Sequence, residues 1–331
     1  MPLVPMRQIL AEAEKGNYGV GAFNVNNMEQ LQAIVNAAAG QKAPVILQVS
    51  RGALEYSEKE YLVAMIRVAA QKNPEIPIAM HLDHGSSLEL VKEVIDLGFT
   101  SVMIDGSLEE DGKTPRSFES NVRLTREVVQ YAHPRGVTVE GELGTLGGIE
   151  EDIAASEVIL TDPRQAGRFV AETGVDALAL AIGTSHGAYK FKKQPVLRMD
   201  IIREVKKLLP ETFLVMHGSS SVPRELVDEV NAHGGKVPGA MGVPIPMIQE
   251  AIGLGIRKIN IDTDGRLAFT GAIRRYMVEN PAVFDQRKYL AAGREAIKSW
   301  VERKMQDFGT AGHAGDYVPA SLEDMKTLYI Q

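Results

Sequence analysis

Short apolar or β-branched segments alternate with longer amphipathic segments along most of the chain. The apolar segments are typical of buried strands, and we predict strands at residues 20–25, 44–50, 76–83, 100–105, 138–144, 177–184, 213–218 and 256–262. The segments between them, such as 28–41 and 87–98, carry apolar residues at three-to-four spacing and polar or acidic residues near their starts, as helices do. Strands that are each followed by a helix predict a (β/α)8 arrangement, the TIM barrel.

An open, doubly wound α/β sheet is the alternative arrangement for such elements. Its dinucleotide-binding form would place Gly-x-Gly-x-x-Gly after the first strand, and that pattern is missing there. Further helices are predicted at 2–15, before the barrel, and at about 285–308, after it, and the chain contains no internal repeat. We therefore expect one TIM-barrel domain over residues 1–331, with an N-terminal helix and extra C-terminal helices.

Composition and charge exclude several classes of function. The formal net charge of −7 over 331 residues opposes binding to nucleic acid or to an anionic membrane surface. The chain has no cysteine, which excludes disulfides, thiolate metal sites and a cysteine nucleophile. The first residues have an amphipathic pattern without the apolar core of a signal peptide, and no apolar run approaches membrane length, so we expect a cytoplasmic protein.

Three histidines stand after apolar runs and directly before a glycine: His84, His186 and His217. Three imidazoles that converge at the mouth of a barrel form a typical catalytic zinc site, with the fourth position open. Asp83 is adjacent to the first of them and is placed to transfer a proton beside the metal. A single histidine of this kind could equally be a polar strand cap, but three favour a site. His81 lies three residues before His84, so we expect the two to point to opposite faces and only His84 to enter the site.

The carboxyl ends of parallel strands lie on one side of a barrel, so their polar residues should ring one mouth. These residues are Asp83, His84, Asp105, Glu142, His186, His217, Asn260 and Asp262. The turns at 183–187, 217–221 and 260–265 are rich in glycine and hydroxyl residues, which lets backbone N–H groups approach an anion. Ordinary tight turns are the alternative for each one. Lys190 and Arg266 are candidates to complement phosphate charge.

Two connections, 145–162 and 232–246, are longer than is usual between a strand and a helix, which is typical of functional loops. The first carries Glu150 and Glu151 after several glycines. A mobile loop with carboxylates suits a general acid–base that arrives once substrate has bound, whereas a solvated acidic loop is the alternative. Glu142, at the preceding strand tip, is better suited to a metal-binding or structural role.

A zinc site, two phosphate-binding corners and two separate carboxylates suit cleavage of a carbon–carbon bond beside a carbonyl in a doubly phosphorylated sugar, with zinc stabilising an enediolate. The segments GAFNVNN, HLDHGSS, MIDGS, VEGELGTLGG, GTSHGAYK, MHGSSSVP and INIDTDGRLAFTGAIR occur in this order. Together they resemble the class II, zinc-dependent fructose-1,6-bisphosphate aldolases, from about residue 3 to the C-terminus. The segment 309–315 is similar to the subgroup often found in the Calvin cycle.

The resemblance implies His84, His186 and His217 as zinc ligands and Asp83 as the group that exchanges the proton of the C4 hydroxyl. It implies Asp105 and Glu142 at a second divalent-metal site, a monovalent cation near the phosphate site, and a homodimer or homotetramer. It implies Glu151 or Glu150, with Glu151 preferred, as the loop acid–base. The substrate contacts that it implies are Ser50, Gly187, Lys190, Gly218, Ser219, Ser220, Asn260, Ile261, Asp262, Thr263 and Arg266, the last of these across a subunit interface.

Alternatives to fructose-bisphosphate aldolase remain at this point. A tagatose-1,6-bisphosphate aldolase would need the same zinc and phosphate groups. A zinc hydrolase on a barrel would carry a His-x-His pair on its first strand, where this chain has GAFNVNN. A sugar-phosphate sensor would bind ligand without proton exchange. Imidazole ligands also leave cobalt or iron as alternatives to zinc.

Overall fold

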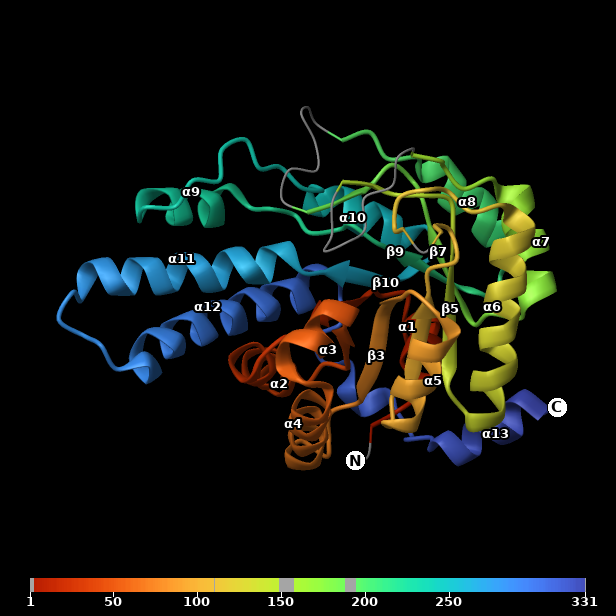
Figure 1. Cartoon of the computed structure of the whole chain (residues 1–331), viewed down its shortest axis with the longest axis horizontal. Helices are drawn as coiled ribbons and strands as arrows, with labels where there is room; N and C mark the ends of the chain where they lie inside the picture. Colours follow the sequence, from red (N-terminus) through yellow and green to blue (C-terminus); the bar gives the residue numbers. More distant parts are fainter. Residues whose placement is uncertain (1–2, 110, 149–157, 188–194, 331) are drawn as a thin grey trace.

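Parallel strands close into a barrel in the computed structural model, which describes residues 3–109, 111–148, 158–187 and 195–330 (Figure 1). The strands follow one another around the barrel in the order β1-β10-β9-β7-β5-β4-β3-β2. Their bounds are β1 Val20–Asn24, β2 Val45–Val49, β3 Ile78–Gly85, β4 Ser101–Ile104, β5 Thr138–Leu143, β7 Ala177–Leu180, β9 Phe213–Met216 and β10 Ile256–Ile261. The predicted TIM barrel is confirmed, and each of its strands overlaps a segment predicted from the apolar pattern.

Helices pack around the barrel, and most of them follow a strand along the chain. They are α1 Met6–Gly16, α2 Met28–Gln41, α3 Arg51–Ser57, α4 Lys59–Lys72, α5 Leu88–Asp96, α6 Phe118–Ala132, α7 Pro163–Thr173, α8 Met199–Leu208, α9 Arg224–Ala232, α10 Ile245–Gly253, α11 Thr263–Glu279, α12 Gln286–Asp307 and α13 Leu322–Ile330. Polar caps begin several of them, because a side-chain oxygen can accept from an otherwise unpaired N–H of the first turn. Asn27 accepts from the Gln30 N–H at 2.9 Å and Ser87 from the Leu90 N–H at 3.2 Å.

The interior of the barrel is apolar at its amino-terminal end. Small and medium side chains point inward from the first half of the strands, and α1 closes this end of the barrel against them. The cluster includes Met6, Ile9, Leu10 and Ala13 of α1 with Val20, Ala22, Ile46, Ala79, Ala177, Ala179, Phe213 and Val215. This cluster fills the end of the interior that lies opposite the carboxyl ends of the strands.

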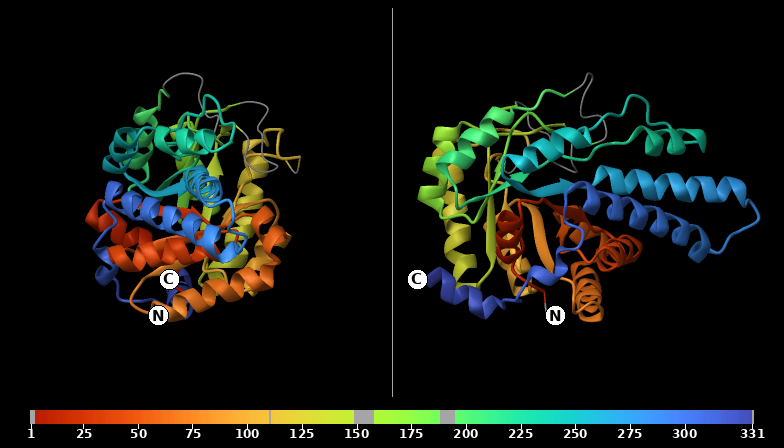
Figure 2. Two further views of the ribbon diagram at one scale, coloured as in Figure 1. Left: turned by 90° about the vertical axis from the view of Figure 1, so that its left-hand side faces the viewer. Right: turned by 180° about the vertical axis from the view of Figure 1, so that it is seen from behind.

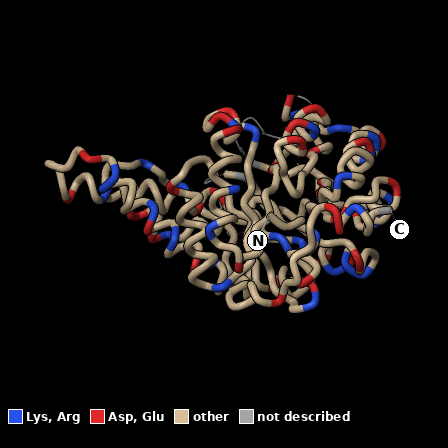
Figure 3. The backbone as a smooth tube through the Cα atoms, turned by 90° about the horizontal axis from the view of Figure 1, so that it is seen from below, with Lys and Arg blue, Asp and Glu red and all other residues tan. Residues whose placement is uncertain are grey.

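A pair of long helices extends away from the barrel. Figure 2 shows α11 and α12 side by side as an arm, and α11 also packs against α9. Met277, Val278 and Phe284 lie at the far end of this arm, and Phe284 is 93% exposed. Seen from below, the charged residues of both signs are interspersed over the surface (Figure 3). No helix among the described residues has the length and apolar character that a membrane span requires.

Two features differ from the sequence prediction. The strand predicted at 177–184 ends at Leu180, and Ser185–His186 (β8) instead pairs with Gly147–Gly148 (β6) in a separate two-stranded sheet. Strands this short have no period that a sequence pattern could reveal. The helices predicted at 2–15 and 285–308 are confirmed by α1 and α12, and α13 is an additional helix beyond them.

Candidate metal centre

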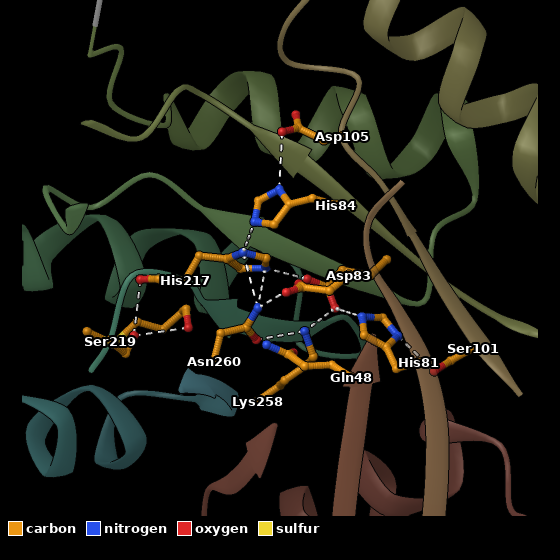
Figure 4. A network of polar contacts seen from close by, with 12 residues as sticks. Gln48, His81, Asp83, His84, Ser101, Asp105, His217, Ser219, Lys258 and Asn260 are labelled. Carbon is orange, nitrogen blue, oxygen red and sulfur yellow. Dashed lines mark hydrogen bonds and ion pairs between the residues drawn. The ribbon is translucent and has the colours of Figure 1, made fainter. Parts of the chain in front are cut away.

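A polar layer fills the carboxyl-terminal half of the barrel interior. Alternate residues of a strand share a face, so pairs two residues apart project inward one above the other. All of the following are buried: Asn24, Gln48, His81, Asp83, Ser101, Glu140, Glu142, His217, Lys258 and Asn260. Figure 4 shows side chains of this layer converging from several strands. The barrel therefore presents a two-tiered polar site at its mouth, with the upper tier nearer to solvent.

His84 joins this site because the backbone departs from regular strand geometry. Its φ of 48° lies in the left-handed region, and the pairing of β3 with β4 changes register between Leu82 and Gly85. Asp83 and His84 can therefore both face the interior, although they are adjacent in sequence. The prediction that only one of His81 and His84 could enter the site was wrong, because the alternation of side-chain direction along the strand fails at this irregularity. His81 lies in the lower tier, with its ring nitrogen 2.8 Å from the Ser101 hydroxyl.

The rings of His84 and His217 face each other through one nitrogen each. His84 Nε2 lies 3.0 Å from His217 Nδ1. The other nitrogen of each ring contacts a carboxylate. His84 Nδ1 lies 3.2 Å from Asp105 (Figure 4), and His217 Nε2 lies 2.8 Å from Glu140. Carboxylates in these positions fix the tautomer and orientation of metal-binding histidines. The geometry thus aims two imidazole lone pairs at one point.

The electrostatics of this point favour a cation. Burial lowers the pKa of His84, but the hydrogen bond with Asp105 and the charges of Asp83, Asp105 and Glu142 outweigh it and raise that pKa well above its ordinary value. Burial raises the pKa of Glu142 well above its usual range, and neighbouring Asp105 adds to the effect. Metal-ligating atoms of Asp83, His84 and His217 lie within 4.8 Å of one another, as do those of His84, Asp105 and Glu142. Nitrogen and carboxylate donors of this kind fit zinc.

Asp83 is held in place by two amide groups. Its two carboxylate oxygens accept hydrogen bonds from Asn24 and Asn260, each at 3.1 Å. These donors come from β1 and β10, on either side of the closure of the barrel. Asp83 thus stands beside the facing histidine nitrogens with its carboxylate orientation fixed, as a proton-transfer group requires.

A small hollow, partly open to solvent, adjoins His217. Its lining includes the predicted residues Gly187, His217, Gly218, Ser220, Asn260, Ile261, Asp262 and Thr263, together with Asn24 and Gln48. At Gly218, φ is 59° and a Cβ would lie 2.6 Å from the Ser185 carbonyl oxygen, so only glycine fits there. The glycine turns therefore form a polar hollow beside the metal-ligand cluster.

The remaining predicted contacts have specific local roles. Ser50 begins α3 and accepts from the Ala53 N–H, and the Ser219 hydroxyl donates to backbone carbonyl oxygens of Met216 and His217. Arg266 pairs with Asp262 at 2.8 Å. The Ile261 side chain belongs to the apolar core, so only its backbone is suited to a substrate contact.

Some predicted residues lie wholly or partly outside what the structure describes. Glu150, Glu151 and Lys190 fall outside the described residues, and of His186 only the backbone is described. That backbone lies in β8, opposite Gly148 of β6, and not at the end of a barrel strand as predicted. The connection after β7 carries the chain beyond the barrel before this histidine is reached.

Sequence reasoning missed the lower tier of the site. Gln48, His81, Glu140 and Lys258 each interrupt an apolar strand, and the last three precede a predicted mouth residue by two positions. That spacing was the available signal, because residues two apart in a strand share a face. Asn24 also stands at the end of the first predicted strand and could have been included with the other strand-end residues.

Comparison with known proteins agrees with this site. The sequence profile described as fructose-bisphosphate aldolase class-II matches residues 4–313. The chain belongs to the class-II fructose-bisphosphate aldolase family. A fructose-bisphosphate aldolase of Giardia intestinalis is 57% identical over 99% of this chain and 100% of its own length. One from Pseudomonas aeruginosa is 48% identical over 99% of this chain and 97% of its own.

Solved structures of similar proteins share the fold. The YdjI aldolase of Escherichia coli K12 superposes with a TM-score of 0.74 at 31% identity, covering 94% of this chain and 99% of that one. A protein of Coccidioides immitis described as a putative fructose-1,6-biphosphate aldolase gives a TM-score of 0.76 at 26% identity, with coverage of 93% and 97%. The class-II family is generally zinc-dependent, in agreement with the donor set of the metal-ligand cluster.

Proposed function

We propose that this protein catalyses the reversible, metal-dependent cleavage of fructose 1,6-bisphosphate to dihydroxyacetone phosphate and glyceraldehyde 3-phosphate. The observation that carries the proposal is the pair of facing nitrogens of His84 and His217 beside the buried carboxylate of Asp83. A zinc ion held by these histidines would supply Lewis-acid chemistry to the reaction. The family match and the names of the relatives support fructose bisphosphate as the substrate.

Asp83 takes the proton of the C4 hydroxyl while the C3–C4 bond breaks. Asn24 and Asn260 keep its carboxylate turned toward the site and away from the solvent. A second proton must be delivered to C3 of the dihydroxyacetone-phosphate half. We assign that transfer to a glutamate of the 145–162 connection, Glu151 in preference to Glu150.

The ligand set for zinc is proposed as His84, His217 and His186. A second divalent ion is proposed at Asp105 and Glu142, whose oxygens form the second ligand group together with His84. The hydrogen bond of Asp105 to His84 also supports a role for Asp105 in orienting that ring. A monovalent cation near the phosphate hollow belongs to the same proposal.

The substrate's two phosphates are proposed to bind on either side of the metal. Backbone N–H groups of Gly187, 218–220 and 260–263, with the hydroxyls of Ser220 and Thr263, suit the phosphate of the dihydroxyacetone half, with Lys190 as an added cation. Ser50 and Arg266 are assigned to the opposite end of the substrate. Arg266 already pairs with Asp262, so its guanidinium would have to exchange partners or contact both.

Metal removal and one substitution test this proposal. We expect chelation to abolish cleavage of fructose bisphosphate and zinc to restore it. Asp83→Ala should lose roughly a hundredfold or more in kcat while zinc remains bound, as expected for a general acid–base. Unchanged turnover in the metal-free protein would exclude the mechanism.

Exchange of deuterium into dihydroxyacetone phosphate separates an aldolase from a sugar-phosphate sensor, which would bind without exchange.

Tagatose 1,6-bisphosphate is the second candidate substrate, because it differs only in configuration at C4. The metal and phosphate groups contact parts that both sugars share. The ratio of kcat/KM for the two sugars decides between them. We expect fructose bisphosphate to be preferred, because relatives named fructose-bisphosphate aldolase match this chain over at least 97% of their length.

We further propose a homodimer or homotetramer built from one barrel domain per chain. The α11–α12 arm supports this, because it projects from the barrel and exposes Met277, Val278 and Phe284 at its end. Exposed apolar side chains that gather at the end of one projecting element are typical of a surface that a partner covers, whereas a single exposed apolar side chain is ordinary. We propose that its small-molecule ligands are sugar phosphates and that it works in the cytoplasm. Its reaction would then belong to glycolysis, gluconeogenesis or the Calvin cycle.

A further inference from the structure

A lysine and a glutamate form an ion pair deep in the barrel, beneath the metal-ligand cluster. Lys258 Nζ lies 2.9 Å from Glu140 Oε2, and both side chains are completely buried. Burying two charges is unfavourable, and well-packed apolar side chains of similar volume would serve stability as well or better. The contacts that this pair makes with the site offer another reason for its presence.

Glu140 connects the ion pair to a candidate metal ligand. Its other oxygen, Oε1, lies 2.8 Å from His217 Nε2. A carboxylate only accepts hydrogen bonds, so this contact places the ring proton of His217 on Nε2. The lone pair of His217 is then on Nδ1, the atom that faces His84 Nε2 at 3.0 Å. Lys258 pairs with the other oxygen of Glu140 and thereby holds this carboxylate against His217.

Lys258 also connects the pair to the proton-transfer carboxylate. Its ammonium group donates to Asn260 Oδ1 at 2.7 Å. A lysine ammonium cannot accept a hydrogen bond, so the amide of Asn260 must turn its oxygen toward Lys258. The Asn260 NH₂ group then points to Asp83, to which it donates at 3.1 Å (Figure 4). One buried cation therefore determines the orientation of groups on both sides of the reacting centre.

We propose that Lys258 is a positioning residue that aligns the metal ligand His217 through Glu140 and the carboxylate of Asp83 through Asn260. The inference rests on the proposed aldolase function, because it assigns roles to those two groups. It extends that function to two residues beneath the site that would touch neither metal nor substrate. It also predicts that the two effects of Lys258 can be separated experimentally.

The test uses the full-length protein with Lys258→Met, Glu140→Gln and the double variant that carries both changes. Each single change leaves one buried charge unpaired, whereas the double variant leaves none and should fold even where a single variant does not. Zinc affinity by competition with a chelator and the absorption spectrum of the cobalt-loaded protein report on His217 without substrate. The values of kcat and KM report on Asp83.

We expect Lys258→Met to weaken zinc binding about ten- to hundredfold, as loss of partners that orient a ligand does, and to lower kcat at least about tenfold. In the double variant the amide oxygen introduced by Glu140→Gln can still accept from His217, so zinc affinity should recover to within about tenfold of the original. The value of kcat should stay low, because Asn260 has no ammonium to orient it. If Lys258 contributed only to stability, the double variant would recover kcat as soon as it recovered folding.

Arg257→Met is the matched control. Arg257 is the neighbour of Lys258 on β10, is 3% exposed, and pairs with Glu14 at 3.0 Å and with Asn17 at 2.8 Å, away from the site. It should lower stability and leave zinc affinity and kcat unchanged. The inference is overturned if Lys258→Met matches the original protein in zinc affinity and kcat, if the double variant regains full kcat, or if Arg257→Met has the same effects. If the original protein binds zinc but does not cleave fructose bisphosphate, only the proposed function is refuted. Zinc affinity and the cobalt spectrum would still test whether Lys258 aligns His217 through Glu140.

Discussion

Replacing Asp264 by asparagine should release the turn that lines the polar hollow. Asp264 is completely buried at the start of α11, and its carboxylate accepts three hydrogen bonds from the turn. Oδ2 accepts from the Ser221 N–H at 2.8 Å and the Ser221 hydroxyl at 2.9 Å, and Oδ1 accepts from the Val222 N–H at 2.7 Å. Val222 has a φ of 44°, a conformation that a β-branched residue rarely adopts. The carboxylate therefore stabilises a strained turn directly after Gly218 and Ser220.

The expected loss follows from these contacts. Hydrogen bonds to a charged group contribute about 1.5–3 kcal/mol each, and a backbone conformation such as that of Val222 costs about 1–3 kcal/mol. Asparagine removes the charge and turns an NH₂ group against the Ser221 donors. Burial raises the pKa of Asp264, which means that desolvation already offsets part of the gain from its donors. We therefore expect Asp264→Asn to lower the free energy of unfolding by about 2–4 kcal/mol.

Urea unfolding at fixed zinc concentration measures that loss, and steady-state kinetics measure its effect on the site. We expect KM for fructose bisphosphate to rise about tenfold with a smaller change in kcat, because the turn is proposed to bind phosphate and not to transfer a proton. Ser221→Ala removes one hydroxyl donor only and should cost about 1 kcal/mol. The reasoning is refuted if Asp264→Asn is no less stable than Ser221→Ala, or if its KM does not change.

Two further predictions concern parts of the molecule away from the site. Burial raises the pKa of Tyr18 from 10.0 to about 12, so its neutral form is favoured in the folded protein. The stability that this group contributes should be complete below pH 10 and should fall by about 3 kcal/mol as the pH rises to about 12. In alkaline unfolding curves, Tyr18→Phe should flatten that fall, whereas the same change at the exposed Tyr56 should not. Parallel curves for the original protein and both variants would contradict this prediction. Phe284→Asp should shift the protein toward the monomer in sedimentation analysis, whereas the same change at the exposed Val196 should not. An unaltered mass for Phe284→Asp would show that the α11–α12 arm is not part of the interface.

The polar ends of the apolar segments allowed much of the site to be predicted. Asp83, His84, His217 and Asn260 were predicted at the mouth of the barrel, and the structure places them together there. The alternation of strand residues would also have revealed Glu140 and Lys258, had it been applied to the whole strand and not only to its end. That information was present because side-chain direction in a regular strand depends only on position along it.

The order of apolar and polar residues by itself determined the barrel, since each strand must bury its side chains and each helix must cover them. Tertiary structure alone decided where that regularity fails. The left-handed backbone of His84 lets two neighbouring residues face inward, the end of β7 at Leu180 carries His186 into a separate small sheet, and Asp264 contacts a turn more than 40 residues away in the chain. These features depend on contacts between distant segments, and local patterns in a sequence do not record such contacts.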